Sequence, residues 1–160
     1  PFLCGLQFQW NSYRLGRGFM IKQKIHLDNY DWDITMYYAI HGYYVDGIID
    51  NLVDIGIRGE KLEKARELLE EGKVNTGLTY VKNGKAVCVI GKASNAAQYA
   101  DSIQHEIMHL AVFIAIAEGI PLESEEVCYI GGEIAQKAWS RTKLLTSECG
   151  CYTRRIGKSL

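Results

Sequence analysis

Hydrophobic and polar residues alternate in the first well-patterned stretch of the chain, residues 21–27 (IKQKIHL). This period of two is typical of a strand with one buried face. Residues 28–33 (DNYDWD) are rich in Asp and Asn, whose side-chain oxygens bond to nearby backbone amides in turns. Residues 34–40 (ITMYYAI) are β-branched and aromatic, which favours a second strand. The pattern therefore predicts strand, turn and strand.

The next part of the chain changes to helical periodicity. Two successive apolar stripes are expected, one in each of two short helices, with Gly56 and Gly72 at the helix ends. The first stripe consists of Val45, Ile48, Ile49, Leu52, Val53 and Ile55, and the second of Leu62, Ala65, Leu68 and Leu69.

A hairpin and two long helices are expected after residue 73. Two β-rich runs within 74–91 flank Asn83-Gly84, a dipeptide that tolerates the positive φ angles of a type I′ turn. A long helix is expected over about 94–118, and a last helix from about Ser124 into the 140s. The expected fold class is α+β, with a small antiparallel sheet.

Composition and charge are those of one globular domain. The 160 residues are 48% hydrophobic and 23% charged, with a net charge of −1, so neither a nucleic-acid partner nor a membrane partner is expected. We expect a single domain over 20–146, an N-terminal extension over 1–19 and a basic C-terminal tail over 147–160. The five cysteines have no disulfide-like spacing, which favours reduced thiols and a cytoplasmic location.

The chemistry is concentrated in residues 101–113 (DSIQHEIMHLAVF), which contain His105, Glu106 and His109 in the pattern HExxH. Residues four apart on an α-helix share a face, so both imidazoles can present a nitrogen to one Zn²⁺ ion, at about 2.0–2.1 Å. Glu106 is rotated around the helix axis and is placed to take a proton from the attacking water as general base. An exposed polar stripe without a metal is the alternative interpretation.

A catalytic zinc needs a third protein ligand, and the expected last helix supplies several candidates. Glu123, Glu125, Glu126 and Glu133 all have the required chemistry. The expected core stripe of this helix consists of Val127, Ile130, Ile134 and Ala138. The hydrophobic pattern does not separate the candidates, because Glu126 and Glu133 border this stripe whereas Glu125 lies on a neighbouring face.

The stretch from His105 to Trp139 resembles the gluzincins, which are zincin-fold metallopeptidases with two His from HExxH and a Glu from the next helix. Residues 20–139 also resemble small zincin-like proteins of gut bacteria and their phages, in which Glu-x-x-x-Tyr-x-x-Gly-x-Ile follows the HExxH helix. Glu125, Tyr129, Gly132 and Ile134 match that pattern. The resemblance implies Glu125 as third zinc ligand and a zinc-dependent hydrolase that cleaves peptide or protein substrates.

Three further expectations concern the surroundings of the site. An oxyanion donor is usually needed in such a reaction, and Tyr129 and His41 are the candidates. Zincin folds place an edge strand above the metal for an extended peptide to pair with, and residues 86–91 are expected to be that strand. His26 is expected to be structural or exposed. A zincin-like module that retains HExxH but only binds or regulates is the main alternative function, and the oligomeric state stays open.

Overall fold

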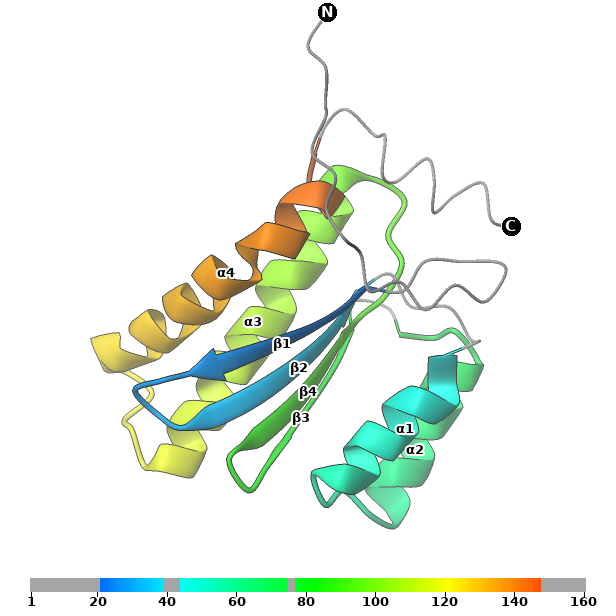
Figure 1. Cartoon of the computed structure of the whole chain (residues 1–160), viewed down its shortest axis with the longest axis horizontal. Coiled ribbons are helices and arrows are strands. Elements are labelled where there is room, and N and C mark those ends of the chain that lie inside the picture. The colour runs from blue at the N-terminus through cyan, green and yellow to red at the C-terminus, as the bar shows by residue number, and fades with distance from the viewer. Residues whose placement is uncertain (1–20, 39–43, 75–76, 148–160) are drawn as a thin grey trace, which may run out of the picture.

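The computed structural model describes residues 21–38, 44–74 and 77–147, so the expected extension at 1–19 and nearly all of the expected tail lie outside the described residues. These described residues form two strands, two short helices, two more strands and two long helices (Figure 1). These are β1 (Ile21–Leu27), β2 (Trp32–Tyr38), α1 (Val45–Asp54), α2 (Glu60–Glu70), β3 (Gly77–Lys82), β4 (Lys85–Ile90), α3 (Ala96–Glu118) and α4 (Glu125–Leu145).

The four strands form one mixed sheet in the order β1-β2-β4-β3. β1 pairs with β2 and β3 pairs with β4 in antiparallel fashion, but β2 and β4 run parallel. The expectation of a small antiparallel sheet is therefore confirmed for β1–β2 and β3–β4 and was wrong for β2–β4. The reason is that the chain crosses over through α1 and α2 between the two hairpins. The second hairpin then pairs with β2 through β4, which is the more apolar of its two strands.

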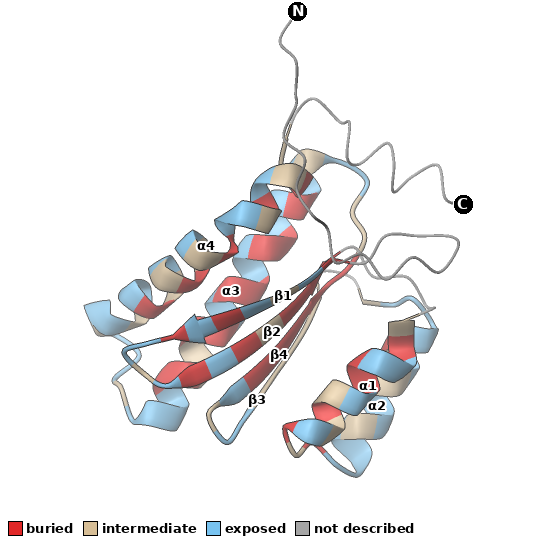
Figure 2. Cartoon of the chain, viewed as in Figure 1, coloured by how far each residue is buried: buried red, intermediate tan, exposed pale blue. Residues whose placement is uncertain are grey.

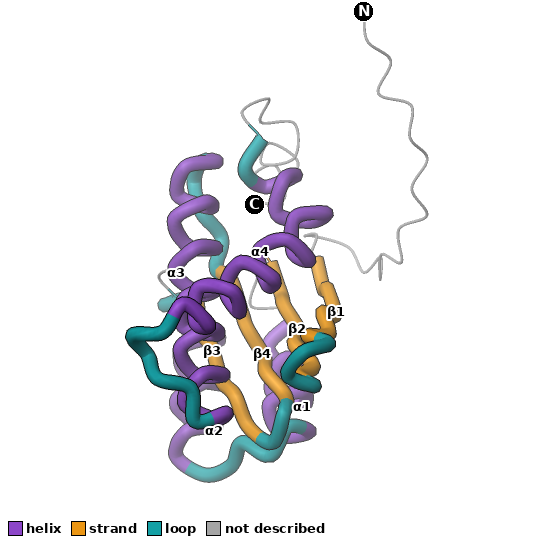
Figure 3. The backbone as a smooth tube through the Cα atoms, turned by 90° about the vertical axis from the view of Figure 1, so that its left-hand side faces the viewer, coloured by secondary structure: helices purple, strands orange, loops and turns teal. Residues whose placement is uncertain are grey.

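Helices cover both faces of this sheet. α3 and α4 lie on one face, and α1 and α2 lie on the other (Figures 1 and 3). Strand β4 contributes to both hydrophobic clusters, because Cys88 and Ile90 belong to the α3/α4 side while Val87 and Val89 belong to the α1/α2 side. A strand with both faces buried needs apolar residues at every position, and Figure 2 shows β4 as a nearly continuous buried run.

The local predictions of strand and turn are largely confirmed. β1 has the expected bounds and buries Ile25 and Leu27 while His26 is exposed. β2 begins earlier than expected, at Trp32, because that indole is only 2% exposed and its residue pairs with Leu27. In the second hairpin, Asn83 and Gly84 both have positive φ, at 53° and 69°, as a type I′ turn requires.

The ends of the long helices follow ordinary capping chemistry. The side chain of Asn95 accepts a hydrogen bond from the backbone N–H of Gln98 at the start of α3, and Gly119 ends that helix in the left-handed conformation. Ser124 is the N-cap residue of α4, as expected. Within the described residues, no helix has the combination of length and hydrophobicity that would let it cross a membrane.

Candidate functional site

The two histidines of the HExxH motif lie together on the exposed surface of α3. Their Nε2 atoms are 3.0 Å apart, and their rings meet edge to face with centroids 4.6 Å apart. Phe113 stacks on His109 with a centroid distance of 5.5 Å, which orients that ring. Two nitrogens bound to one tetrahedral zinc at the usual distance are about 3.3 Å apart. The separation of the two imidazoles therefore fits a shared zinc ion.

Glu106 points to a different side of α3 and is only 2% exposed. The hydroxyl of Thr79 on strand β3 donates a hydrogen bond of 2.6 Å to Oε2 of Glu106. Gly77, at the start of the same strand, lies directly against the Glu106 side chain, since a Cβ at this position would come within 2.5 Å of Cγ and Cδ. Strand β3 thus holds the carboxylate in place.

Sequence reasoning missed the roles of Gly77 and Thr79. A glycine within a β-rich run is the one available indication, because glycine in a strand often marks a place where another group approaches the backbone closely. Nothing in the local pattern identifies which group approaches. The partner is 29 positions away in the chain, on α3.

The edge strand beside the motif helix is β3, whereas the run at 86–91 lies inside the sheet. Residues 85–90 form β4, which is hydrogen-bonded to β2 on one side and to β3 on the other. The expectation that 86–91 form the edge strand was therefore wrong. The apolar composition of this run suits an interior strand, whereas β3 is only partly buried along its length and takes the edge.

The carboxylates of α4 have other partners. Glu125 accepts a hydrogen bond of 3.2 Å from the Tyr129 hydroxyl, Glu126 accepts one from Tyr30, and Glu133 lies 3.1 Å from the ammonium of Lys137. No group of three or more His, Cys, Asp or Glu side chains that could hold a metal occurs in the described part of the chain.

The third ligand consequently stays a prediction. Gly131 packs near Ala111 and Ile107, which places the second turn of α4 beside the middle of α3. Glu125 and Glu126, in the first turn of α4, therefore lie toward the C-terminal end of α3. The structure brings His105 and His109 together but does not bring Glu125 to them.

The structure describes Tyr129, one of the two candidate oxyanion donors. Tyr129 is 64% exposed, and its hydroxyl donates to Glu125. Its expected role in stabilising an oxyanion stays a prediction. His41 lies outside the described residues.

Cys88 lies close to the Glu106–Thr79 pair and is fully buried. Burial is the main cause that raises the pKa of the Cys88 thiol to about 12. The nearby charge of Glu106 also raises this pKa, whereas a hydrogen bond with Thr79 lowers it. The thiol therefore stays protonated at neutral pH and is unsuited to act as a nucleophile.

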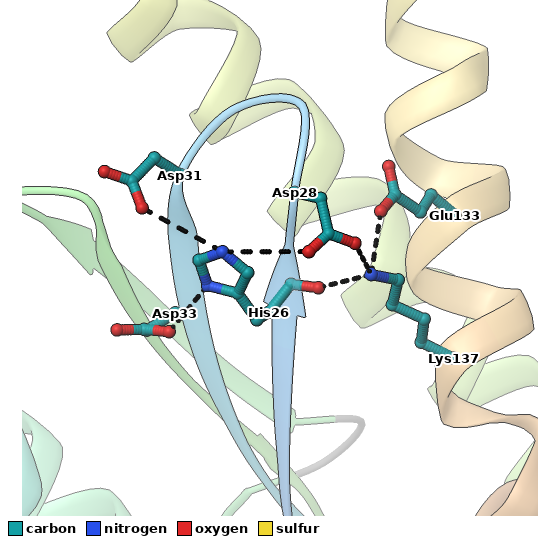
Figure 4. Close-up of polar contacts among 6 residues, drawn as sticks. All are labelled: His26, Asp28, Asp31, Asp33, Glu133 and Lys137. Atoms are coloured by element: carbon teal, nitrogen blue, oxygen red, sulfur yellow. Dashed lines mark hydrogen bonds and ion pairs between the residues drawn. The ribbon is translucent and has the colours of Figure 1, made fainter.

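His26 lies in a separate polar cluster at the end of the β1–β2 hairpin (Figure 4). Its Nδ1 atom is 2.9 Å from Oδ1 of Asp33, and Nε2 is 3.9 Å from Asp31 and 4.0 Å from Asp28. The hydrogen bond with Asp33 is the main cause that raises the pKa of His26. Desolvation lowers this pKa, and the negative charges of the three carboxylates raise it further. The expectation that His26 is structural or exposed agrees with this placement.

Lys137 connects the same hairpin to α4. Its ammonium donates 2.6 Å to the backbone carbonyl of His26, lies 2.8 Å from Asp28, and pairs with Glu133 on its own helix (Figure 4). The hydrogen bond with Asp28 is the main cause that raises the pKa of Lys137. The cluster therefore ties the tip of the hairpin to the second long helix.

The raised pKa of His26 predicts a pH dependence of stability. Protonated His26 stabilises the fold at pH values below its unfolded pKa of about 6.5, and this contribution is lost as the pH rises through the folded pKa. The stability difference between wild type and His26→Gln should therefore be larger at pH 6 than at pH 9, measured by urea unfolding. Lys24→Gln, an exposed change on the same strand, is the control. An equal difference at both pH values would contradict the assignment.

The motif helix thus offers two exposed, converging imidazoles and, beside them, a buried carboxylate held by an edge strand. Imidazoles suit zinc, and a fixed carboxylate suits proton transfer. Comparison of the chain with protein-family models, with curated proteins and with solved structures finds no match.

Proposed function

We propose that the chain is a zincin-like, zinc-dependent hydrolase that cleaves peptide bonds. His105 and His109 would hold Zn²⁺, and Glu106 would act as general base. The observation that carries the proposal is the 3.0 Å separation of the two Nε2 atoms on an exposed helical face. An antiparallel edge strand beside the motif helix also supports a zincin-like arrangement.

Each residue has a defined task in this proposal. Zinc, when bound, polarises the scissile carbonyl and lowers the pKa of water. Thr79 holds Oε2 of Glu106 by its hydrogen bond, so the carboxylate has a fixed position from which it takes the proton of the attacking water. Glu106 then passes that proton to the leaving amine. Phe113 keeps the His109 ring oriented toward His105.

Glu125 is the first choice for the third ligand. Its partner, Tyr129, lies on the same helix and is exposed, so their hydrogen bond is easily exchanged for another contact. Glu126 and Glu133 remain alternatives. Tyr30, between β1 and β2, already donates a hydrogen bond to Glu126, and Lys137 on α4 itself pairs with Glu133. Metal binding through Glu125 would require the first turn of α4 to move toward the two histidines.

Strand β3 is the proposed docking edge for the substrate backbone. Among the described strands it pairs with β4 alone, and it holds the proposed base through Thr79. An extended peptide that adds to this edge would bring its backbone close to Glu106.

Metal content tests this proposal directly. Elemental analysis of purified wild type should give about one zinc per chain, and His109→Ala should lose it because one imidazole cannot hold the ion alone. Gln104→Ala, an exposed change beside His105, should keep the zinc. Loss in Glu125→Ala would support Glu125 as third ligand, whereas retention would direct the search to Glu126 and Glu133. Wild type that takes up no zinc, even when zinc is added back, would refute the proposal.

The burial of Glu106 favours a second candidate function. A carboxylate that is 2% exposed and bound by Thr79 can serve structure instead of proton transfer. The chain would then be a catalytically silent zincin-like binding or regulatory module. One zinc per chain without hydrolysis of a varied peptide library would favour this candidate. The cytoplasmic location expected from the cysteines stays a prediction.

A further inference from the structure

A cavity with a volume of about 380 Å³ lies on the face of the sheet opposite to α3 and α4. Strands β1, β2 and β4 form its floor, and the end of α1 forms one wall. The floor is open because α1 and α2 pack over β2, β4 and β3, and no described residue of β1 belongs to the hydrophobic cluster on this face. The volume is within the range of about 300–1,000 Å³ that is common for small-ligand sites.

The floor of the cavity offers hydrogen-bond donors and positive charge. Side chains of paired residues share a face of the sheet, so Lys24 on β1 lies beside Thr35 on β2, and Lys85 on β4 lies beside Asp33. Both lysines are exposed, and neither has a hydrogen bond or ion pair with another described residue. Asp33 already bonds to His26, at 2.9 Å (Figure 4). The two ammonium groups are therefore the charges that this floor offers to a ligand.

The wall formed by α1 offers acceptors instead. The side-chain nitrogen of Asn51 donates to the Tyr37 hydroxyl and to the Gly47 carbonyl, so its side-chain oxygen is left to accept a bond. Asp54 ends the helix, where the helix dipole already places partial negative charge, and the last turn contains no basic residue. Arg58 donates to backbone carbonyls near this helix end but does not line the cavity. Both the carboxylate and the dipole therefore favour a cation at this wall.

We propose that this cavity binds a small molecule with two anionic groups and one ammonium group, which is the charge pattern of a free acidic amino acid. With Asp33 bonded to His26, two positive charges and one negative charge remain in the lining. The anionic groups bind the two lysines, and the ammonium binds Asp54 at the end of α1, so every charge of the ligand has a partner. The cavity and α3 lie on opposite faces of the sheet, so the inference does not depend on the proposed hydrolase function.

Titration of the purified full chain with L-glutamate, followed by the amide signals in NMR spectra, tests the proposal. Binding should saturate with a Kd on the order of 1 mM, because partly solvated ion pairs are weak. Glutamine lacks one anionic group and glutarate lacks the ammonium, so each should bind about fivefold more weakly, the upper end of what one exposed ion pair contributes. Absence of saturable binding in the millimolar range, or inorganic phosphate that binds as tightly as glutamate, would overturn the inference.

Variants that remove single charges identify the groups that bind. Lys24→Met and Lys85→Met should each weaken glutamate binding about fivefold, whereas Lys64→Met, an exposed change on α2 outside the cavity, should leave it unchanged. Asp54→Asn should weaken the binding of glutamate but not of glutarate, which has no ammonium. Asp50→Asn, an exposed change on the same helix outside the cavity, should affect neither. Equal effects of the cavity variants and their controls would contradict the proposal.

The positions of the shifted signals locate the ligand independently of the variants. Glutamate should shift the amide signals of Lys24 and Thr35 on the floor and of Asp54 on the wall. The signals of His105 and His109, on the other side of the sheet, should stay in place. Shifts that fall elsewhere, such as on α3, would place the ligand outside the cavity and overturn the inference without affecting the proposed hydrolase.

Discussion

Replacing Gly77 with alanine is expected to lower the free energy of unfolding by about 3 kcal/mol, at the upper end of what overpacking usually costs. The added Cβ would lie 2.4 Å from the backbone oxygen of Val89 and 2.5 Å from Cγ and Cδ of Glu106. The carbonyl belongs to the neighbouring strand β4 and cannot move without disturbing the sheet. Either β3 shifts away from β4 or Glu106 leaves its place, and both disturb the candidate site.

Urea unfolding of Gly77→Ala and Gly47→Ala provides the measurement and its control. Gly47 lies inside α1, and a Cβ there would meet nothing within 4 Å in the described part of the chain. Alanine should therefore stabilise that helix by about 0.5–1 kcal/mol. Gly77→Ala with the stability of wild type would show that Glu106 does not lie against β3.

Replacing Glu106 with glutamine is expected to lower the rate of peptide hydrolysis by about 10²- to 10⁴-fold, the usual contribution of a general base. The amide has nearly the same shape and can still accept the hydrogen bond from Thr79, but it cannot take a proton from water. Because Glu106 is not an expected zinc ligand, metal content should stay at the wild-type value. The measurement is kcat/KM on a peptide that wild type cleaves, with zinc measured on the same samples.

Changes at Thr79 provide the matched control for the role of Glu106. Thr79→Val removes the hydroxyl that donates 2.6 Å to Glu106 while keeping the shape of the side chain. It should lower the rate less than Glu106→Gln does, and Thr79→Ser, which keeps the hydroxyl, should restore it. Full activity in Glu106→Gln would exclude Glu106 as general base and require another group to move the proton.

Most of the secondary structure could be predicted from the sequence because its determinants are local. Alternation over 21–27 specifies β1, and Asn83-Gly84 specifies the turn of the second hairpin. The apolar stripe of α4 is buried as expected at Ile130 and Ile134. In each case the relevant residues lie within a few positions of one another, so backbone geometry relates them directly.

The start of β2 shows where local reasoning failed. Asp31 and Asp33 were both predicted to lie in the turn. Asp33 instead lies in β2, and of the two only Asp31 has the positive φ of a turn residue. The burial of Trp32 decides the boundary, because its indole enters the core and donates a hydrogen bond of 2.7 Å to Glu118 on α3. That partner is 86 positions away, outside any local window.

The sequence by itself determined that His105 and His109 lie on one helical face, since the 3.6-residue period of the helix relates them. It did not determine which strand lies beside them. Only the tertiary structure decided that β3 lies at the edge of the sheet and that Glu106 packs against Gly77 and accepts a hydrogen bond from Thr79. It also decided that Glu125, the first residue of α4, does not lie next to the two histidines. The physical reason is that edge position and helix packing result from competition among all apolar surfaces for burial, which depends on the whole chain.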